Sequence, residues 1–315
     1  MAKFPLGQTG LEVSQLCFGA LPMGPLQRNM PPERGGQVIA KALDLGVNFI
    51  DTAQVYETYE HIRQGILGRP RPIIASKSFA ENYEDMAAAI EEALTALDVD
   101  YIDIFHLHAP RCGTDFARER AGALKCLLDH KEQGLIKAVG ISTHTIAAVK
   151  AAAQRDDIDV IYPIINFKGL GILDGTAEEM AQAIAEAAQK GKGLYAMKVF
   201  GGGNLLDQKE RALEFVFNIP GLDVISIGMV HEREVEMNLR LLAGERVAPD
   251  SPYYVPLEEK ELFISRFCTA CGNCVDTCPN HALEIVEDRA QVDKDSCLLC
   301  GYCSPVCPQF AIRLV

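Results

Sequence analysis

Short apolar runs, separated by longer segments with helical periodicity, occupy most of the chain up to residue 246. Each run is rich in β-branched or other apolar residues and is bounded by Gly, Pro or Asp, which is typical of buried strands. We expect eight strands, at residues 14–20, 48–53, 73–78, 101–109, 138–143, 160–167, 193–200 and 224–229.

The segments between these runs favour amphipathic helices. In residues 85–99, one helical face is marked by Met86, Ile90, Ala93, Leu94 and Leu97. Strand and helix alternate in this way along the whole segment, which is the length and rhythm of a (β/α)8 barrel. A doubly wound sheet is the alternative, but it more often has a GxGxxG turn after its first strand, and PMGPLQ does not match that pattern. We therefore expect an α/β fold with a TIM barrel over residues 1–246.

The end of the chain differs from the rest in its high cysteine content. Residues 247–263 are Pro-rich at first and then continue as a short helical stretch, so they are expected to be a linker. Residues 264–315 contain eight of the 11 cysteines. The order C-x2-C-x2-C-x3-C-P occurs twice there, beginning at Cys268 and again at Cys297. This is the run of bacterial ferredoxins that hold two 4Fe–4S clusters in a small α+β domain.

The spacing also predicts which cysteines bind which cluster. Three thiolates two residues apart surround one corner of a cubic cluster, and the fourth cysteine of the run lies too far along to close it. The expected ligand sets are therefore Cys268, Cys271, Cys274 and Cys307 for one cluster, and Cys297, Cys300, Cys303 and Cys278 for the other. A zinc site would use four cysteines and leave four unused. The remaining cysteines lack partners at ligand spacing and are expected to be ordinary thiols: Cys17, Cys112 and Cys126.

Composition and charge exclude several classes of protein. A chain of 315 residues with 48% hydrophobic residues can bury one large core and a small second unit. Its formal net charge of −13 argues against a general nucleic-acid binder. No apolar run approaches the roughly 18 residues of a membrane span, and the start, MAKFPLGQTG, lacks the pattern of a signal peptide. We therefore expect a cytoplasmic protein that has no membrane span and does not bind nucleic acid.

Polar residues at the C-terminal ends of the expected strands are the first candidates for catalysis, because barrel enzymes place their chemistry there. These positions carry Asp51 and, just beyond it, Tyr56, followed by Lys77 and His108. Reduction of a carbonyl needs a proton donor at oxygen, and a phenol with a pKa of about 10 is a weak acid at neutral pH. We expect Lys77 to lower the pKa of Tyr56, and Asp51 to keep the lysine charged. His108 is expected to orient the substrate oxygen, whereas His106 is expected to fill the barrel interior.

Four segments resemble the aldo-keto reductases at the landmarks of that family: FPLGQTGLEVSQLCFGALPMG, NFIDTAQVYE, IIASK and YIDIFHLHAP. The resemblance implies a small carbonyl or alcohol substrate and a catalytic set made of Asp51, Tyr56, Lys77 and His108. The tail resembles bacterial ferredoxins. The whole chain therefore looks like an aldo-keto reductase barrel fused to a dicluster ferredoxin.

The same resemblance implies a site for NADP or NAD beside the glycine run that follows the seventh strand. The candidate cofactor residues on this basis are Ser142, Thr143, Asn166, Lys198, Gly201, Gly202, Gly203, Arg233, Glu236 and Asn238. Three positions depart from the family: Thr143 stands for an Asn, Tyr162 for a Gln, and Met197 for the aromatic that stacks on the nicotinamide. Glu232 beside Arg233 weakens selectivity for a 2′-phosphate, so both dinucleotides stay open.

The two halves raise a question of electron count, because a nicotinamide transfers two electrons as hydride and each cluster transfers one. Nothing in the sequence looks like a flavin site. In the function we favour, the clusters pass electrons between an external one-electron carrier and a barrel site that interconverts carbonyl and alcohol. The second alternative is an NAD(P)H-dependent carbonyl reductase whose ferredoxin unit is structural or senses oxygen or redox state. The third is an electron-transfer or regulatory module with a little-used barrel site.

Overall fold

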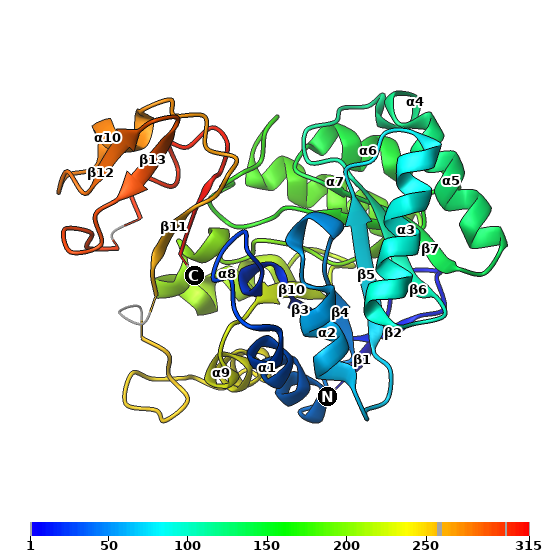
Figure 1. Cartoon of the computed structure of the whole chain (residues 1–315), viewed down its shortest axis with the longest axis horizontal. Helices are drawn as coiled ribbons and strands as arrows, with labels where there is room; N and C mark the ends of the chain where they lie inside the picture. Colours follow the sequence, from blue (N-terminus) through cyan, green and yellow to red (C-terminus); the bar gives the residue numbers. More distant parts are fainter. Residues whose placement is uncertain (1, 257–259, 300, 315) are drawn as a thin grey trace.

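A closed sheet of eight parallel strands forms the centre of the protein in this computed structural model, which describes residues 2–256, 260–299 and 301–314 (Figure 1). The strands are β3 (Leu16–Gly19), β4 (Phe49–Asp51), β5 (Ile73–Ser78), β6 (Ile102–His108), β7 (Ile136–Thr143), β8 (Val160–Pro163), β9 (Gly193–Leu194) and β10 (Ile225–Gly228). They pair in the order β10-β3-β4-β5-β6-β7-β8-β9. A parallel bridge between Ala196 and Ile225 closes the ring. The eight predicted strands and the (β/α)8 barrel are thus confirmed.

Helices cover the outside of this barrel. They are α1 (Pro32–Asp44), α2 (Tyr59–Ile66), α3 (Tyr83–Leu97), α4 (Phe116–Glu119), α5 (Ala121–Glu132), α6 (Ile146–Ala153), α7 (Ala177–Gln189), α8 (Lys209–Phe217) and α9 (Glu232–Leu242). Helix α3 begins before the predicted residue 85 because the Asn82 side chain caps it by accepting a hydrogen bond from Asp85 N. Across the described ranges, no helix has both the length and the apolar character needed to cross a membrane.

An N-terminal hairpin, β1 (Lys3–Pro5) and β2 (Glu12–Ser14), lies against the N-terminal ends of the barrel strands. Leu6 is buried there, and Gly7, with a φ of 55°, packs directly on the backbone of Gly193. A Cβ at Gly7 would lie 2.3 Å from Gly193 N, so only glycine fits. The hairpin covers this end of the barrel, and the catalytic candidates lie at the opposite end.

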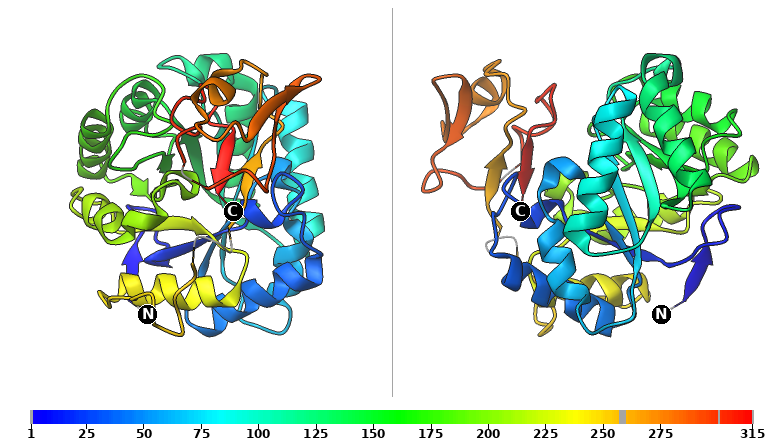
Figure 2. Two further views of the ribbon diagram at one scale, coloured as in Figure 1. Left: turned by 90° about the vertical axis from the view of Figure 1, so that its left-hand side faces the viewer. Right: turned by 45° about the vertical axis from the view of Figure 1, so that its right-hand side comes forward.

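The C-terminal domain is a separate lobe with its own small core (Figure 2). Strand β11 (Leu262–Ile264) pairs antiparallel with β14 (Ile312–Leu314), and β12 (Leu283–Val286) pairs with β13 (Arg289–Val292). The described residues of this domain also form one short helix, α10 (Asn273–Thr277). Of the expected linker, residues 257–259 lie outside the described residues. The helical stretch expected near its end is wrong from Leu262 onward, because the apolar residues there form β11.

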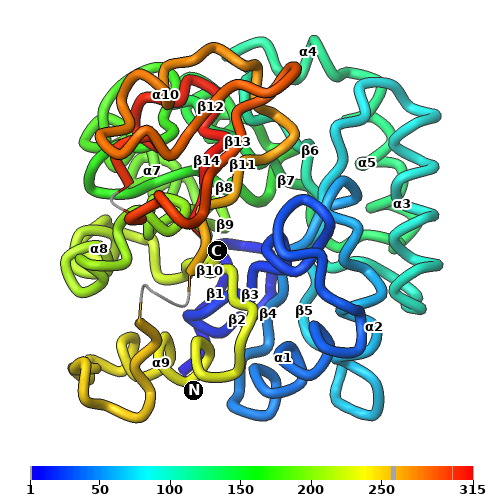
Figure 3. The backbone as a smooth tube through the Cα atoms, turned by 60° about the vertical axis from the view of Figure 1, so that its left-hand side comes forward, coloured from blue at the N-terminus to red at the C-terminus, as the bar shows by residue number. Residues whose placement is uncertain are grey.

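The C-terminal domain docks beside the mouth of the barrel (Figure 3). Asn204, just after the seventh barrel strand, donates a hydrogen bond to Ser304 Oγ at 2.8 Å. Arg28, after the first strand, forms an ion pair of 3.1 Å with Glu261. These barrel residues lie in loops that follow the C-terminal ends of strands. The domain therefore contacts the end of the barrel at which the catalytic candidates lie.

Candidate active site

A buried ion pair lies at the C-terminal ends of β4 and β5. Lys77 Nζ is 2.9 Å from Asp51 Oδ1 and 2.7 Å from Oδ2, and it also donates to Thr52 O at 2.7 Å. The two side chains are only 1% and 4% exposed. Burial opposes both charges, so it raises the pKa of Asp51 and lowers the pKa of Lys77. Each ion offsets the loss of solvation of the other, and neither is stable there alone.

Two tyrosines extend this pair into the barrel interior. Tyr195 donates to Asp51 Oδ1 at 3.0 Å, and Tyr162 donates to Oδ2 at 3.4 Å. Their rings stack with centroids 4.0 Å apart. His106 is fully buried, with Nε2 2.7 Å from the Tyr195 hydroxyl, so its predicted place in the interior is confirmed. The tyrosine pair fixes the orientation of the Asp51 carboxylate, a role that the sequence analysis did not assign.

Tyr56 lies in a single 3-10 turn, η2 (Gln54–Tyr56), directly after β4. Lys77 Nζ lies above its ring, 4.8 Å from the centroid, while the hydrogen bonds of the lysine go to Asp51 and Thr52. Burial, followed by the negative charge of Asp51, raises the pKa of Tyr56. The expectation of a lowered pKa is wrong, because burial and the negative charge of Asp51 outweigh any effect of Lys77. Tyr56 is thus held as a neutral phenol that keeps its proton.

His108 ends β6 and lies next to Tyr56. Its ring stacks on Phe79 at 4.0 Å and meets the Tyr56 ring edge-on at 6.0 Å. Burial, and then the charge of Lys77, lower the pKa of His108 well below its ordinary value, so the imidazole is neutral. A neutral imidazole has one N–H donor, which can be offered to a substrate oxygen. The structure therefore brings all four predicted catalytic residues together.

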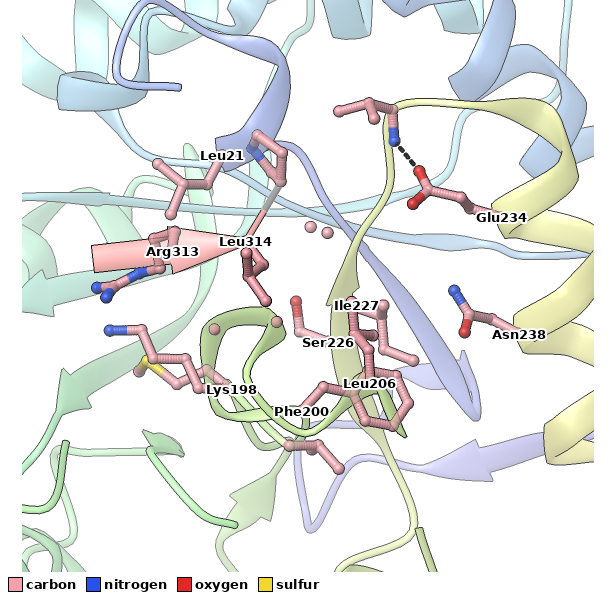
Figure 4. A pocket seen from close by; sticks show the side chains of 18 of the residues that line it. Leu21, Lys198, Phe200, Leu206, Ser226, Ile227, Glu234, Asn238, Arg313 and Leu314 are labelled. Atoms are coloured by element: carbon pink, nitrogen blue, oxygen red, sulfur yellow. Dashed lines mark hydrogen bonds between the residues drawn. The ribbon is translucent and has the colours of Figure 1, made fainter. Parts of the chain in front are cut away.

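A cavity of about 1140 Å³, including its open mouth, extends from Asp51 and Tyr56 across the barrel. Ser226 and Ile227 of β10 form part of its wall, and Glu234 and Asn238 of α9 lie at its far side (Figure 4). Strand β14 adds two lining residues from the C-terminal domain, Arg313 and Leu314. The cavity is thus built by both domains.

Four of the expected cofactor residues line this cavity: Lys198, Gly202, Gly203 and Asn238. Asn238 Oδ1 is buried and has no hydrogen-bond partner among the described residues, so an acceptor is available at that end. The glycines have a different neighbour from the expected phosphate. A Cβ on Gly203, whose φ is 95°, would lie 2.6 Å from Leu314 Cβ. Gly203 therefore permits the close approach of β14.

The other expected cofactor residues are not part of the cavity wall as described. Asn166 uses both ends of its amide on the backbone of Leu170, at 2.9 Å each. The Thr143 hydroxyl lies 3.1 Å from that of Thr145, and Glu236 forms an ion pair with α1 at 2.6 Å. The remaining residues of this group also lie outside the described wall: Ser142, Gly201 and Arg233.

The cysteines of the C-terminal domain surround two small cavities. The first, of about 330 Å³, is lined by Cys268, Cys271, Cys274 and Cys307. The second, of about 340 Å³, is lined by Cys278, Cys297 and Cys303; Cys300 lies outside the described residues. Each cavity combines cysteines from both runs, in the grouping that the spacing predicts. Of the other thiols, Cys17 and Cys126 are buried and Cys112 is partly buried.

Backbone N–H groups point at several of these sulfur atoms. Three such contacts have an N···Sγ distance of 3.3 Å: Ala290 N to Cys268, Ala282 N to Cys278, and Ala311 N to Cys307. Such donors stabilise thiolates and adjust the reduction potential of an iron–sulfur cluster. The donor set and the cavities therefore fit two 4Fe–4S clusters.

Comparisons with known proteins match both domains. The model of the aldo/keto reductase family matches residues 15–239, and that of the 4Fe-4S dicluster domain matches residues 267–311. An L-galactose dehydrogenase of Arabidopsis thaliana is 27% identical over 220 residues, which are 64% of this chain and 66% of that protein. A methylglyoxal reductase of Escherichia coli K12 is 25% identical over 171 residues, 51% of this chain and 61% of that protein. Each match spans less than two thirds of the relative.

Solved structures agree with this assignment. A structure from Pseudomonas aeruginosa assigned to the aldo-keto reductases has a TM-score of 0.67 at 25% identity, covering 77% of this chain and 95% of that one. An aldo-keto reductase from Bacillus halodurans has a TM-score of 0.63 at 19% identity, covering 79% and 93%, and shows the fold alone. The family uses NADP(H). The protein is therefore an oxidoreductase that belongs to the aldo/keto reductase family and carries a 4Fe–4S dicluster domain behind its barrel.

Proposed function

We propose that the protein interconverts a small carbonyl compound and its alcohol at the site formed by Asp51, Tyr56, Lys77 and His108, and that two 4Fe–4S clusters connect this site to an external one-electron carrier. The observation that carries the proposal is the position of β14. This strand begins five residues after the thiol ligand candidate Cys307, and it lines the cavity that contains Tyr56. The first cysteine cavity and the catalytic cavity thus share one short segment, because Ile312 lines the former and Arg313 and Leu314 line the latter.

The chemistry at the barrel site follows from the protonation states. A carbonyl oxygen placed between Tyr56 and His108 receives a hydrogen bond from the neutral imidazole. Tyr56 donates its proton as negative charge develops on that oxygen. The ammonium of Lys77 above the ring then stabilises the phenolate, and Asp51 keeps that ammonium in place. Alcohol oxidation uses the same groups in reverse.

Each cluster can carry one electron when bound, which matches the two electrons by which a carbonyl differs from its alcohol. Of the two protons required, Tyr56 supplies the one at oxygen, and solvent water supplies the one that forms the C–H bond. The part played by the chain is to hold the thiols and to link them to the cavity. Phe310 N donates to Cys307 O at 2.9 Å, and the Phe310 ring lies 4.2 Å from the Arg313 guanidinium carbon. This short connection leads from one thiol cavity to the catalytic cavity.

The second thiol cavity offers a place for the external carrier. Leu298 and Tyr302 line it and are 73% and 62% exposed, which is unusual for large apolar side chains grouped together. We assign this face to docking of a small one-electron carrier protein. Since thiolate-bound clusters react with oxygen, an anaerobic cytoplasm suits such a protein.

One observation favours the second candidate function, an NAD(P)H-dependent carbonyl reductase in which the C-terminal domain is structural or senses redox state. The buried Oδ1 of Asn238, an expected cofactor residue, lacks a partner in the part of the chain that the structure describes, and it lies at the far side of the cavity. Asn238 and Lys198 would hold the dinucleotide, which supplies a hydride when bound. In this function β14 serves as a wall of the pocket.

Turnover under anaerobic conditions distinguishes the two candidates. We expect small carbonyl compounds to be reduced with a reduced viologen dye as the only electron donor, because the dye delivers single electrons. Reduction that requires NADPH and never proceeds with the dye supports the second candidate. No reduction with either donor contradicts the assignment of the barrel site.

Anaerobically purified protein should contain about eight iron and eight labile sulfide per chain, as two four-iron clusters require. Cys271→Ser removes a ligand candidate of the first cavity, so about half of the iron should be lost or labile. The matched control is Cys112→Ser, a partly buried barrel thiol, which should keep the full content. Zinc in place of iron, or full content in Cys271→Ser, contradicts the ligand assignment.

A further inference from the structure

Two cationic side chains, one from each domain, meet at one side of the catalytic cavity. Lys198 follows β9 in the barrel, and Arg313 lies in β14. Both lie over the ring of Phe310, with Lys198 Nζ 4.9 Å and the Arg313 guanidinium carbon 4.2 Å from its centroid. Figure 4 shows their charged ends on the same side of the cavity, opposite Glu234 and Asn238.

No carboxylate among the described residues pairs with either cation, and the negative charge that acts on Arg313 is that of the ligand candidate Cys307 in its own domain. Lys198 Nζ lies 3.1 Å from His144 Nε2, and Arg313 donates to the backbone oxygen of Ile312 at 2.9 Å. The two carboxylates that line the cavity are held elsewhere, Asp51 by Lys77 and Glu234 by Lys260. Both side chains are partly buried, and cations withdrawn from solvent are normally paired. The cavity is therefore short of an anion at this point.

The electrostatics and the backbone agree with this conclusion. Burial, and then the positive charge of Arg313, lower the pKa of Lys198 well below its ordinary value. Burial lowers the pKa of Arg313 to about 10. Lys198 also has a φ of 59°, a left-handed conformation that is rare outside glycine. A lysine kept in a strained conformation beside a second cation indicates a functional role.

We propose that Lys198 and Arg313 form an anion site that binds the carboxylate of the substrate, so that the carbonyl compound is an acid of the 2-oxo type. This inference rests on the proposed function, because it places the carbonyl between Tyr56 and His108. Both cations line the same cavity as Tyr56, the proposed proton donor.

The two cations suit a carboxylate in different ways. Arg313 presents a planar fork that can hold both oxygens of a carboxylate, and Lys198 adds a compact charge. Bound in this way, the acid would have its carbonyl fixed relative to the proton donor before the reaction begins. Because Arg313 belongs to the C-terminal domain, the substrate would contact both domains.

Phosphate groups of a dinucleotide share this chemistry, so the test needs two ligands. We suggest calorimetric titration of the anaerobic full-length protein with oxamate, which has a carboxylate beside an amide carbonyl, and with oxamide, its neutral counterpart. Oxamate should bind the unmodified protein and oxamide should not. Lys198→Gln and Arg313→Gln should each weaken oxamate binding by about 10- to 100-fold, the usual value of a hydrogen bond to a charged group.

Three controls make the result specific. Lys168→Gln, at an exposed lysine outside the cavity wall, should leave oxamate affinity unchanged. NADPH affinity, titrated in parallel, should be the same in Arg313→Gln as in the unmodified protein, because Arg313 is not among the expected cofactor residues. Tyr56→Phe should still bind oxamate, so the anion site can be established even if the proposed reaction fails. Iron content and circular dichroism identify a misfolded variant. Because the two cations belong to different domains, a folding defect in one variant leaves the other variant available to test oxamate binding.

If folded Lys198→Gln or Arg313→Gln protein keeps the oxamate affinity of the unmodified protein, the proposal is overturned. Equal binding of oxamide also overturns it, because a charge-independent ligand does not need the two cations. A loss of NADPH affinity in Arg313→Gln as large as the loss of oxamate affinity assigns the pair to the dinucleotide phosphates and overturns it as well.

Discussion

Replacing Tyr56 with phenylalanine should lower the turnover of carbonyl reduction by about 100-fold or more, the usual contribution of a general acid. The hydroxyl is the only group lost. The ring remains under Lys77 and at the edge of His108, so the folded structure and substrate binding should change little. Single-turnover rates with saturating substrate measure the effect directly.

Tyr101→Phe is the matched control, because this tyrosine lies before β6 at the other end of the strand, stacked against Arg71 and Lys137. Its turnover should equal that of the unmodified protein. If Tyr56→Phe retained near-normal turnover, Tyr56 would not be the proton donor. The departures at Thr143, Tyr162 and Met197 would then indicate different chemistry.

Replacing Lys77 with methionine should lower the free energy of unfolding by about 3–5 kcal/mol, the usual cost of breaking a buried ion pair on one side. Asp51 would keep its charge in a site where its side chain is 4% exposed, with no cation to balance it. For a barrel of this size the loss corresponds to a fall of roughly 6–20 °C in Tm. Differential scanning calorimetry measures it.

The double variant Asp51→Asn, Lys77→Met provides the control for this prediction. It removes both charges, so it should recover most of the lost stability although it remains inactive. The pKa of Asp51 should rise further in Lys77→Met, so the defect should shrink as the pH falls and the carboxyl becomes protonated. If Lys77→Met were as stable as the unmodified protein at all pH values, Lys77 would not balance the buried charge of Asp51.

The barrel could be predicted because its strands are locally encoded as buried apolar runs with helical segments between them. The predicted strand boundaries differ where the chain bends. Strand β9 contains only Gly193–Leu194 of the predicted 193–200, because the sheet there continues as single bridges and the backbone turns at Lys198. Strand β8 likewise stops at Pro163, before the predicted residue 167.

The catalytic candidates could be found because each lies at or just beyond the end of a strand, in a sequence segment that resembles the aldo-keto reductases. Other parts of the site depend on contacts between distant segments, and no local pattern reports those. Tyr195 donates to Asp51 across the barrel, and Arg313 reaches the cavity from another domain. The glycine run matched a phosphate site in sequence, yet Gly203 lies against Leu314. The close approach of β14 explains that glycine equally well.

In the proposed function, electrons move between the clusters and the barrel site. The most direct test mixes dithionite-reduced protein, freed of excess reductant, with a carbonyl substrate in an anaerobic stopped-flow instrument and without nicotinamide. We predict that the iron–sulfur absorbance returns to its oxidised value at least as fast as steady-state turnover, with one alcohol formed for every two electrons lost. Absorbance that stays reduced, in protein that still converts the same substrate at full rate with NADPH, would contradict the claim.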